Sequence, residues 1–291
     1  MSKRLGIIGG SGLYEIPGVD VFETHSLDTP WGAPSAPILE CKHEEQSFFF
    51  LPRHGVGHSI SPSKINYRAN VDAFKKLGVT DVLSLSSVGS LNEDLSPGVF
   101  VIIDQYIDLT KNRISTFFED DIVVHVSMAK PTDETLMQIS KTCLEKLQIK
   151  FNYGGLYICI EGPQFSTCEE SKLFQNWGCD VIGMTSMPEA KLCREASLRY
   201  LNVGMVTDFD CWHPNHDNVE VSNVISTLNR NAEVAKKFIL EFMLVYSRST
   251  MINNLNSYNS LVTAKDKIKK DTARKLKNIL PNLLKDFTKY K

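Results

Sequence analysis

The chain has 291 residues, of which 42% are hydrophobic, so it is long enough and apolar enough to bury a full α/β core. This composition excludes the disordered, collagen-like and fibrous classes. Thirty-two Lys and Arg residues against 34 Asp and Glu residues give a formal net charge of −2, which provides no bulk field for gripping nucleic acid or an anionic membrane.

The cysteines and the short apolar run at the N-terminus indicate the cellular compartment in which we expect the protein. The seven cysteines are odd in number, scattered and never arranged as C-x-x-C, so they predict neither a disulfide framework nor a zinc knuckle. The apolar run at the N-terminus is too short for a secretion signal, and no stretch approaches the ~18 uncharged apolar residues of a membrane span. We therefore expect a soluble protein of the cytoplasm, with the nucleus left open as a second compartment and no membrane partner.

Short apolar runs rich in β-formers recur along the chain, bounded by Gly, Pro, Asp or Asn. These predicted strands are Leu5–Ile8, Ser47–Leu51, Val82–Leu85, Phe100–Ile103, Tyr157–Ile160, Val181–Met184 and Val203–Val206. Helical periodicity lies between several of them, at Ile65–Leu77 and at Pro188–Tyr200. The alternation predicts an α/β body with a largely parallel or mixed sheet.

The segment after the predicted strand Val181–Met184 carries a helix start signal. Ser186 and Glu189 have the spacing of a capping box, with Pro188 inside the first turn. Met184 and Thr185 should therefore lie at the carboxyl end of a strand, where open α/β sheets bind ligands.

Composition changes near Ser247, where Ser and Asn accumulate, and this predicts a linker. We therefore divide the chain into a body, residues 1–246, and a linker with a basic amphipathic tail, residues 247–291. Residues 265–291 hold ten basic and three acidic residues beside an apolar stripe. One or two surface helices broken at Pro281 are expected there, in preference to a membrane or nucleic-acid arm.

Four predicted strand-to-loop junctions offer hydrogen-bond donors suited to an anion. They carry Ser11 within a glycine-rich turn, the pair Arg53 and His54, the pair Ser86 and Ser87, and Thr185. Taken singly, the glycine turn fits a plain tight turn, and Arg53 fits a solvated loop arginine paired with a carboxylate. No dinucleotide or P-loop fingerprint occurs, so the four junctions together predict a site for inorganic phosphate or another small oxyanion.

Two acids, Asp208 and Asp210, follow the predicted strand Val203–Val206. In an extended segment they would point the same way, and could form an acid/base pair, bind a metal, or face a nitrogen-rich ring. A helix cap or a turn is the alternative. Cys211, His213 and His216 match no zinc-ligand spacing, so we expect no metal.

The motifs together carry a family resemblance. They are Gly6–Leu13, Arg53–Gly55, Pro62–Tyr67, Glu161–Ser166, Val181–Thr185, Pro188–Glu189 and Thr207–Trp212. In order along residues 5–244, the chain resembles the trimeric purine nucleoside phosphorylases, specifically their S-methyl-5'-thioadenosine phosphorylase branch. The tail after Ser247 lies outside the resemblance.

The resemblance implies a single α/β domain with a twisted mixed β-sheet flanked by helices, and a homotrimer with sites near subunit interfaces. It also implies reversible phosphorolysis of S-methyl-5'-thioadenosine to adenine and 5-methylthioribose 1-phosphate, in purine and methionine salvage. Phosphate is a co-substrate, and no metal or organic cofactor is expected. The implied partners are a small-molecule nucleoside and phosphate.

The resemblance also implies a role for individual residues. The expected phosphate-binding residues are Ser11, Arg53, His54, Ser86, Ser87 and Thr185. The expected substrate-binding residues are Phe165, Ser166, Ile182, Met184, Asp208, Phe209, Asp210, Val221, Val224, Ile225 and, from the adjacent subunit, His125. Asp208 is the expected catalytic acid for N7 of the purine, since burial and Asp210 can raise its pKa above the ~3.9 reference value.

Three positions depart from the branch pattern. Ser11 stands where Thr is usual, Leu85–Ser90 replaces a T-T-A-C-G-S-like run, and Val56–Gly57 replaces longer polar residues. The hydroxyl groups needed for phosphate are retained.

Two other functions remain as alternatives. A 6-oxopurine nucleoside phosphorylase would carry Asn in place of Asp208 and a polar group in place of Val221. A non-catalytic purine-binding or assembly protein would have lost Arg53, Thr185 or Asp208, and all three are present.

Overall fold

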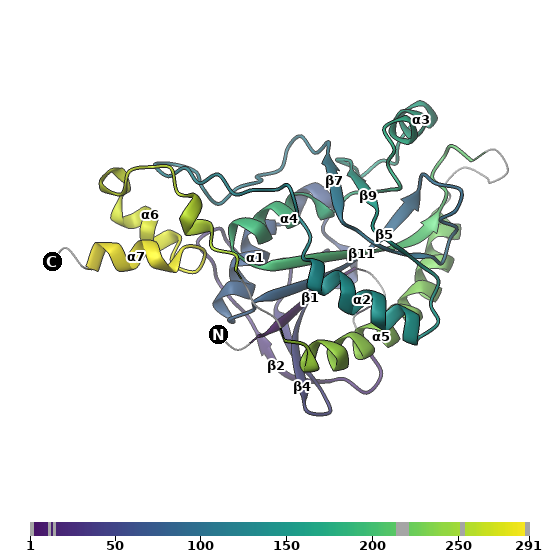
Figure 1. Cartoon of the computed structure of the whole chain (residues 1–291), viewed down its shortest axis with the longest axis horizontal. Helices are drawn as coiled ribbons and strands as arrows, with labels where there is room; N and C mark the ends of the chain where they lie inside the picture. The colour runs from purple at the N-terminus through teal and green to yellow at the C-terminus, as the bar shows by residue number, and fades with distance from the viewer. Residues whose placement is uncertain (1–2, 11–12, 14–15, 214–220, 251–253, 289–291) are drawn as a thin grey trace.

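An eleven-stranded mixed β-sheet flanked by helices forms the body of the protein (Figure 1). The computed structural model describes residues 3–10, 13, 16–213, 221–250 and 254–288, and the side chains of all of these except residues 221–224 and 286–288. The predicted fold class, an α/β fold with a mixed sheet flanked by helices, is confirmed.

Each of the seven predicted strands is present, and four further strands complete the sheet. The strands are β1 (Leu5–Gly9), β2 (Asp20–His25), β3 (Ile38–His43), β4 (Gln46–Pro52), β5 (Asp81–Ser90), β6 (Phe100–Ile102), β7 (Gln105–Asp108), β8 (Phe151–Tyr153), β9 (Leu156–Cys159), β10 (Val181–Gly183) and β11 (Arg199–Asp208). The helices are α1 (Tyr67–Lys76), α2 (Glu134–Lys146), α3 (Cys168–Asn176), α4 (Ser186–Glu195), α5 (Val221–Arg248), α6 (Lys270–Lys275) and α7 (Pro281–Thr288).

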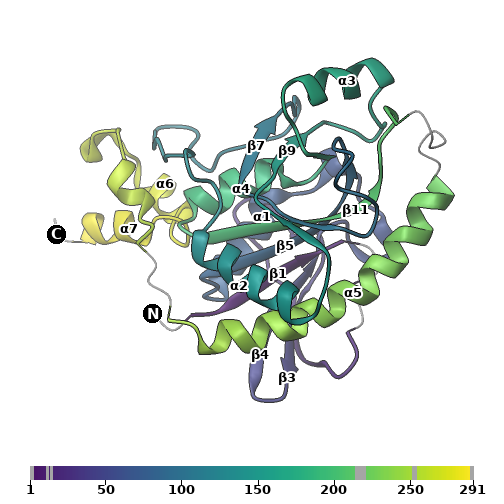
Figure 2. The ribbon, with the colours of Figure 1, turned by 45° about the vertical axis from the view of Figure 1, so that its right-hand side comes forward.

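Side chains alternate between two buried clusters, one on each face of the sheet. Along β1, Ile7 faces the cluster formed with α2 and α5, and Ile8 faces the cluster formed with α1 and α4. Figure 2 shows α2 and α5 on one side of the strands and α1 and α4 on the other. Helices thus cover both faces of the central strands, which is why these strands are apolar almost throughout.

The edge of β5 that faces away from β11 is shared by two strands of opposite direction. Pairing with β11 extends along β5 from Asp81 to Gly89, so β1 and β10 must both lie on the other edge. Parallel pairing with β1 ends at Ser84, and antiparallel pairing with β10 begins at Gly89. Residues 85–88 lie between these two registers, and we call this stretch the β5 gap.

The predicted capping box at Ser186 is wrong. The residue that precedes α4 is Thr185, which makes no side-chain cap bond, and Met187 has non-helical backbone angles (φ −116°, ψ 133°). Glu189 instead binds Arg53 in the interior. The helix also ends at Glu195, so the predicted helix over Pro188–Tyr200 is wrong at its end, where β11 begins at Arg199.

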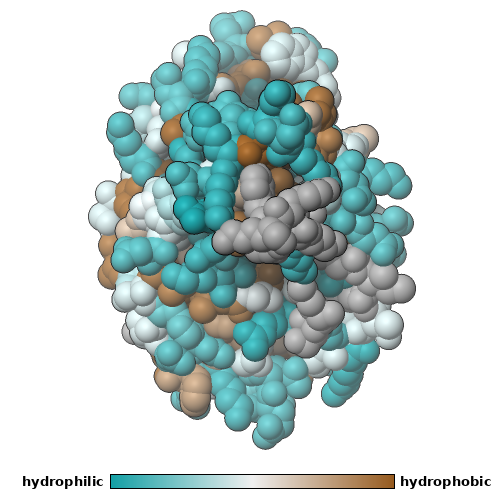
Figure 3. Space-filling view, turned by 90° about the vertical axis from the view of Figure 1, so that its left-hand side faces the viewer, coloured by the Kyte–Doolittle hydropathy of each residue, from teal (hydrophilic) through white to brown (hydrophobic). Residues whose placement is uncertain are grey.

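The C-terminal segment packs against the body. Leu276, Ile279 and Leu280 are buried in the same cluster as Phe74 of α1, and the Nδ2 of Asn278 donates to Asp72 Oδ1 at 3.1 Å. Figure 3, which views the side carrying this segment, shows a largely hydrophilic surface with scattered apolar groups. The apolar stripe of the segment is therefore directed inward. The boundary at residues 246 and 247 stays a prediction, and α5 itself continues to Arg248.

None of the helices in the described part of the chain combines the length and apolar character needed to cross a membrane.

We predict that Leu280→Ala destabilises the whole protein and not only the C-terminal segment. Leu280 is 1% exposed, and truncating a buried leucine costs about 2–5 kcal/mol of unfolding free energy. Urea unfolding followed by fluorescence and circular dichroism should show one transition at lower urea, whereas Lys277→Ala, on the exposed side, should change little. A separate early transition with an unchanged main transition would contradict this expectation.

Candidate active site

A cavity of about 590 Å³ opens at the β5 gap and gathers most of the residues singled out in the sequence. Strands β4, β5, β10 and β11 contribute their ends or the loops that follow, and α5 closes one side. The described residues that line it are Gly10, Arg53, His54, His58, Pro62, Ser86, Ser87, Val88, Gly89, Ile160, Pro163, Phe165, Ser166, Ile182, Gly183, Met184, Thr185, Thr207, Asp208, Asp210, Ile225, Leu228 and Asn229.

Arg53 is buried at the end of β4 and is paired with a carboxylate. Its Nε and one terminal nitrogen donate to Glu189 at 2.9 and 3.2 Å, and the terminal nitrogens also donate to Ser84 Oγ at 2.6 Å and to the carbonyl of Leu85 at 3.1 Å. Burial disfavours the charged guanidinium, but Glu189 outweighs burial and raises the pKa of Arg53. Four of the five N–H donors are thus held by described protein groups. The guanidinium therefore binds mainly to Glu189, and one of its N–H donors remains for a ligand.

His54 and His58 form a stacked pair on the cavity wall, with ring centroids 4.0 Å apart. His54 Nδ1 lies 2.8 Å from the carbonyl oxygen of Ile60, so Nδ1 carries the proton and donates. Burial, together with the charge of Arg53, lowers the pKa of His54 to about 4, and burial also lowers the pKa of His58. The pair is therefore neutral near pH 7, and Nε2 of His54 is an acceptor.

The hydroxyl groups at the cavity differ in whether other groups of the protein already hydrogen bond to them. Ser86 and Asn202 are hydrogen bonded, with Ser86 Oγ 3.1 Å from Asn202 Nδ2. Among described residues, Ser87 Oγ and Thr185 Oγ1 have no hydrogen-bond partner. These two hydroxyls can thus serve a ligand. Ser11 lies outside the described residues, although neighbouring Gly10 lines the cavity.

Asp208 and Asp210 both line the cavity, but a turn and not strand alternation brings them together. Asp208 ends β11, and Asp210 has a left-handed φ of 50°. Asp208 accepts from Thr207 Oγ1 at 2.7 Å and from the backbone N–H of Asp210 at 2.9 Å, and Asp210 accepts from Ser166 Oγ at 2.8 Å. Burial raises the pKa of each carboxyl, against hydrogen bonds that lower it. One of the two can therefore hold a proton more readily than a surface aspartate.

Apolar side chains form the walls between the two polar ends. Phe165, Ile182, Met184 and Ile225 line the cavity. Leu228 and Asn229 join Ile225 on one face of α5, because residues three and four apart share a face. The side chains of Val221 and Val224 lie outside the described ones.

Two predicted site residues lie elsewhere. The ring of Phe209 contacts the ring of His213, with centroids 4.7 Å apart, and is not among the described lining residues. His125 is exposed, and its backbone N–H donates to the carbonyl of Ser260 at 3.0 Å. It does not line the described cavity of its own chain.

Arg113 is a structural determinant of the cavity that the sequence analysis missed. Its buried guanidinium donates to the carbonyls of Met184 and Met187 at 2.6 Å each and to that of Glu161 at 2.7 Å. It thereby holds the loop after β10 against the loop after β9. The close approach at Gly183 supports this arrangement, since a Cβ there would collide with the Tyr157 hydroxyl. A lone arginine in a polar loop carries no sequence signal for such a role.

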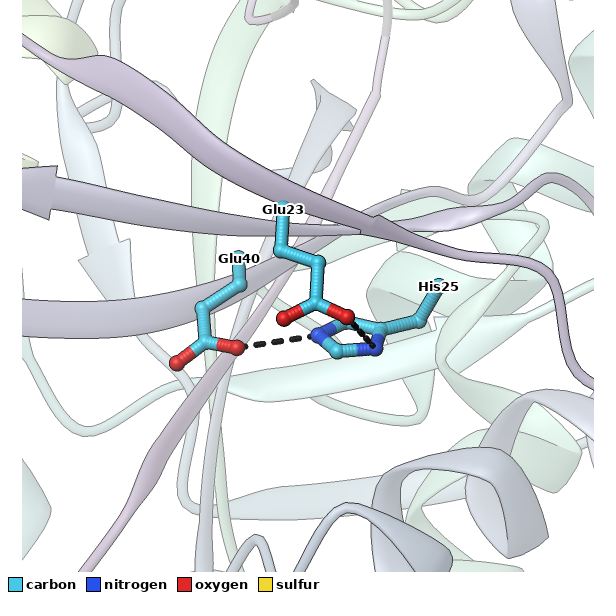
Figure 4. A group of neighbouring side chains, drawn as sticks. All are labelled: Glu23, His25 and Glu40. Atoms are coloured by element: carbon cyan, nitrogen blue, oxygen red, sulfur yellow. Dashed lines mark hydrogen bonds and ion pairs between the residues drawn. The ribbon is translucent and has the colours of Figure 1, made fainter.

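A second ionisable cluster lies at the sheet edge, on β2 and β3 (Figure 4). The two ring nitrogens of His25 face different carboxylates, Nε2 toward Glu40 Oε2 at 2.9 Å and Nδ1 toward Glu23 Oε1 at 3.6 Å. Each carboxylate thus faces a ring nitrogen of its own, so the imidazole of His25 bridges the two carboxylates. None of the three residues lines the described cavity.

Comparisons with known proteins assign the fold to a class. Residues 4–243 match the family described as the phosphorylase superfamily, so the fold and cavity define a member of that class. An S-methyl-5'-thioadenosine phosphorylase of Rhodospirillum rubrum is 52% identical over 235 residues, 81% of this chain and 80% of that protein. The chain belongs to the S-methyl-5'-thioadenosine phosphorylase family of this superfamily.

Solved structures agree. A methylthioadenosine phosphorylase from an Antarctic soil metagenomic library matches with a TM-score of 0.90 and 42% identity, over 96% of this chain and 99% of that chain. A mutant of the Schistosoma mansoni adenosine/methylthioadenosine phosphorylase, solved in complex with methylthioadenosine, matches with a TM-score of 0.81 and 34% identity, over 86% and 93% of the chains.

We predict a pH-dependent stability contribution from His54. Its pKa is about 4 in the folded protein against a usual 6.5, so the unfolded chain binds the proton first as the pH falls. The free energy of unfolding is therefore unaffected by the titration of His54 above pH 6.5. Below pH 6.5 it falls progressively until about pH 4, by up to about 3 kcal/mol in total. Urea unfolding at pH 7, 5.5 and 4.5 should show a steeper acid loss for the wild type than for His54→Gln. Parallel curves for the wild type and His54→Gln would refute the assignment.

Proposed function

We propose that this protein catalyses reversible phosphorolysis of S-methyl-5'-thioadenosine, giving adenine and 5-methylthioribose 1-phosphate, within purine and methionine salvage. The observation that carries the proposal is one cavity with oxyanion donors at the β5 gap and, at the end of β11, the half-buried carboxyl of Asp208 and the buried carboxyl of Asp210, both of raised pKa. A phosphate oxygen attacks the anomeric carbon, the bond from that carbon to N9 breaks, and the purine leaves after gaining a proton.

The phosphate end uses the groups that the protein leaves available. The remaining N–H of Arg53, the hydroxyls of Ser87 and Thr185 and the glycine turn with Ser11 donate to phosphate, and Nε2 of His54 accepts from a protonated phosphate oxygen. Ser86 sits beside them, held by Asn202. Charge-assisted hydrogen bonds contribute about 1.5–3 kcal/mol each, so a few suffice to fix the nucleophile.

The purine end uses Asp208 as the acid and Asp210 as its neighbour. Burial raises the pKa of Asp208, so its protonated form is more accessible than that of a surface aspartate, and protonation of N7 stabilises the negative charge that develops on the leaving base. Asp210, fixed by Ser166 and Ser171, accepts from the 6-amino group. Phe165 and Ile182 contact the ring, and Phe209 supports the loop that carries both acids.

The ribose and its 5'-substituent occupy the apolar part of the cavity. Met184 contacts the ribose, and Ile225 lies against the methylthio group. The family resemblance assigns Val221 and Val224, at the start of α5, to the same pocket. The protein acts as a homotrimer in which His125 enters the site of the adjacent subunit, which fits its exposure here. An apolar 5' pocket favours a thioether over a hydroxyl, because a buried hydroxyl without a partner costs free energy.

We predict that adenine release from S-methyl-5'-thioadenosine requires phosphate. A spectrophotometric assay should show release that rises with phosphate concentration and saturates, with equimolar 5-methylthioribose 1-phosphate as the second product. Equal release without phosphate would identify a hydrolase, and the roles given to Ser11, Arg53 and Thr185 would then be wrong.

We predict that Asp208→Asn lowers kcat for S-methyl-5'-thioadenosine far more than it raises the Kd of adenine, because the proton donor acts mainly in the transition state. The new amide N–H can meet O6 of inosine, so the ratio of kcat/KM values should shift toward inosine by at least about tenfold, or about 1.4 kcal/mol.

Asp210→Asn provides the matched control for this change. This substitution changes the carboxylate that accepts hydrogen bonds from Ser166 and Ser171, and it should weaken adenine binding more than it lowers kcat. An Asp208→Asn variant with unchanged turnover and base preference would remove Asp208 from the mechanism.

A further inference from the structure

Cys168 and Cys211 bring their thiols together beside the purine end of the cavity. Cys168 is the first residue of α3, and Cys211 follows the Asp210 turn. Cys168 Sγ lies 3.2 Å from the carbonyl oxygen of Cys211, so the two cysteines are in direct contact. The remaining five cysteines are free and buried, so this pair combines proximity with access from solvent.

The two thiols differ in a way that suits a sequential oxidation. Cys168 is exposed at the first position of α3, directly after the Thr167 cap. Cys211 is half-buried, and burial raises the pKa of its thiol to about 11. An oxidant therefore reaches Cys168 first, and Cys211 lies in contact with the product.

We propose that Cys168 and Cys211 form an intramolecular disulfide when the protein meets a hydroperoxide, and that this bond reversibly impairs the purine end of the site. In the first step the Cys168 thiolate attacks hydrogen peroxide, giving a sulfenic acid and, after protonation of the released hydroxide, water. In the second step the Cys211 sulfur attacks the sulfenic sulfur, the S–S bond forms, and the sulfenic hydroxyl leaves as water with the Cys211 proton. The thiols together lose two electrons and two protons, and one peroxide molecule becomes two water molecules.

The contacts of Cys211 connect the bond to the site. Its Sγ lies 3.1 Å from Ser171 Oγ and donates to the carbonyl of Ser166 at 3.3 Å. Ser166 and Ser171 are the residues that donate to the carboxylate of Asp210. A disulfide requires sulfurs about 2.05 Å apart, so Cys211 or the start of α3 must shift and disturb these serines. The effect on turnover rests on the proposed function, whereas bond formation does not.

The test measures bond formation and activity on the full-length protein. Reduced protein is treated with a few equivalents of hydrogen peroxide, alkylated and mapped by peptide mass spectrometry. We expect a Cys168–Cys211 linked peptide, a fall in phosphorolysis and adenine affinity of about tenfold or more, and recovery with dithiothreitol, since small misplacements at a site cost rates on this scale.

Matched variants separate this bond from general damage. Cys168→Ser should keep basal activity and resist peroxide, whereas Cys179→Ser, a change at a buried cysteine just after α3, should stay as sensitive as the wild type. The proposal is overturned if the wild type yields no linked peptide, if the link joins two copies of the chain, or if Cys168→Ser loses activity equally.

The activity of the untreated protein distinguishes failure of the disulfide proposal from failure of the proposed function. If untreated protein does not phosphorolyse S-methyl-5'-thioadenosine, the proposed function fails, and the peptide map with adenine binding still decides whether the bond forms and disturbs the site. If untreated protein is active and the linked form is equally active, the regulatory part is wrong.

Discussion

The buried pair of Arg53 and Glu189 joins two strands of the sheet and a helix at the place where the strand pairing of the sheet is interrupted. Arg53 comes from the end of β4, Glu189 from α4, and both bind Ser84 of β5. Burying two charges is costly unless the remaining donors and acceptors are satisfied. Here Tyr200 and Ser84 complete the coordination of the Glu189 carboxylate, so the pair stabilises the rim of the cavity.

This constraint divides the electrostatics of the site into two regions. At the β5 gap the cationic group is already matched by a carboxylate, so an incoming anion meets neutral hydroxyls, a neutral imidazole and one remaining guanidinium donor. At the end of β11 the situation is reversed, because the hydrogen bonds that the two carboxyls accept from described residues come from neutral hydroxyl and backbone groups, and burial raises the pKa of both. The β5 gap therefore offers hydrogen-bond donors beside a positive charge that is already paired. The end of β11 offers carboxyls that keep a proton more readily than a surface aspartate does.

The sequence predicted those parts of the fold that depend on local pattern. All seven apolar runs became strands because their apolar side chains are buried in the core of the protein, and Asp208 and Thr185 lie at strand ends as expected. Strand β2 was missed because it is an exposed edge strand, so it has no apolar pattern to read. The α4 start was misread because a long-range ion pair took Glu189 from the local cap. Arg113 was missed for the same reason, since its carbonyl partners lie about 50 to 70 residues away in the sequence.

The packing of the C-terminal segment on α1 has a consequence for the nascent chain. The strands and helices through α5 can be complete while the side of α1 that carries Phe74 still lacks its covering residues, Leu276, Ile279 and Leu280. These residues leave the ribosome only after the whole α/β body has been made. During that interval an apolar surface is open to solvent, and such transient exposure is what favours aggregation and chaperone binding. Premature termination near residue 250 would make this temporary state permanent.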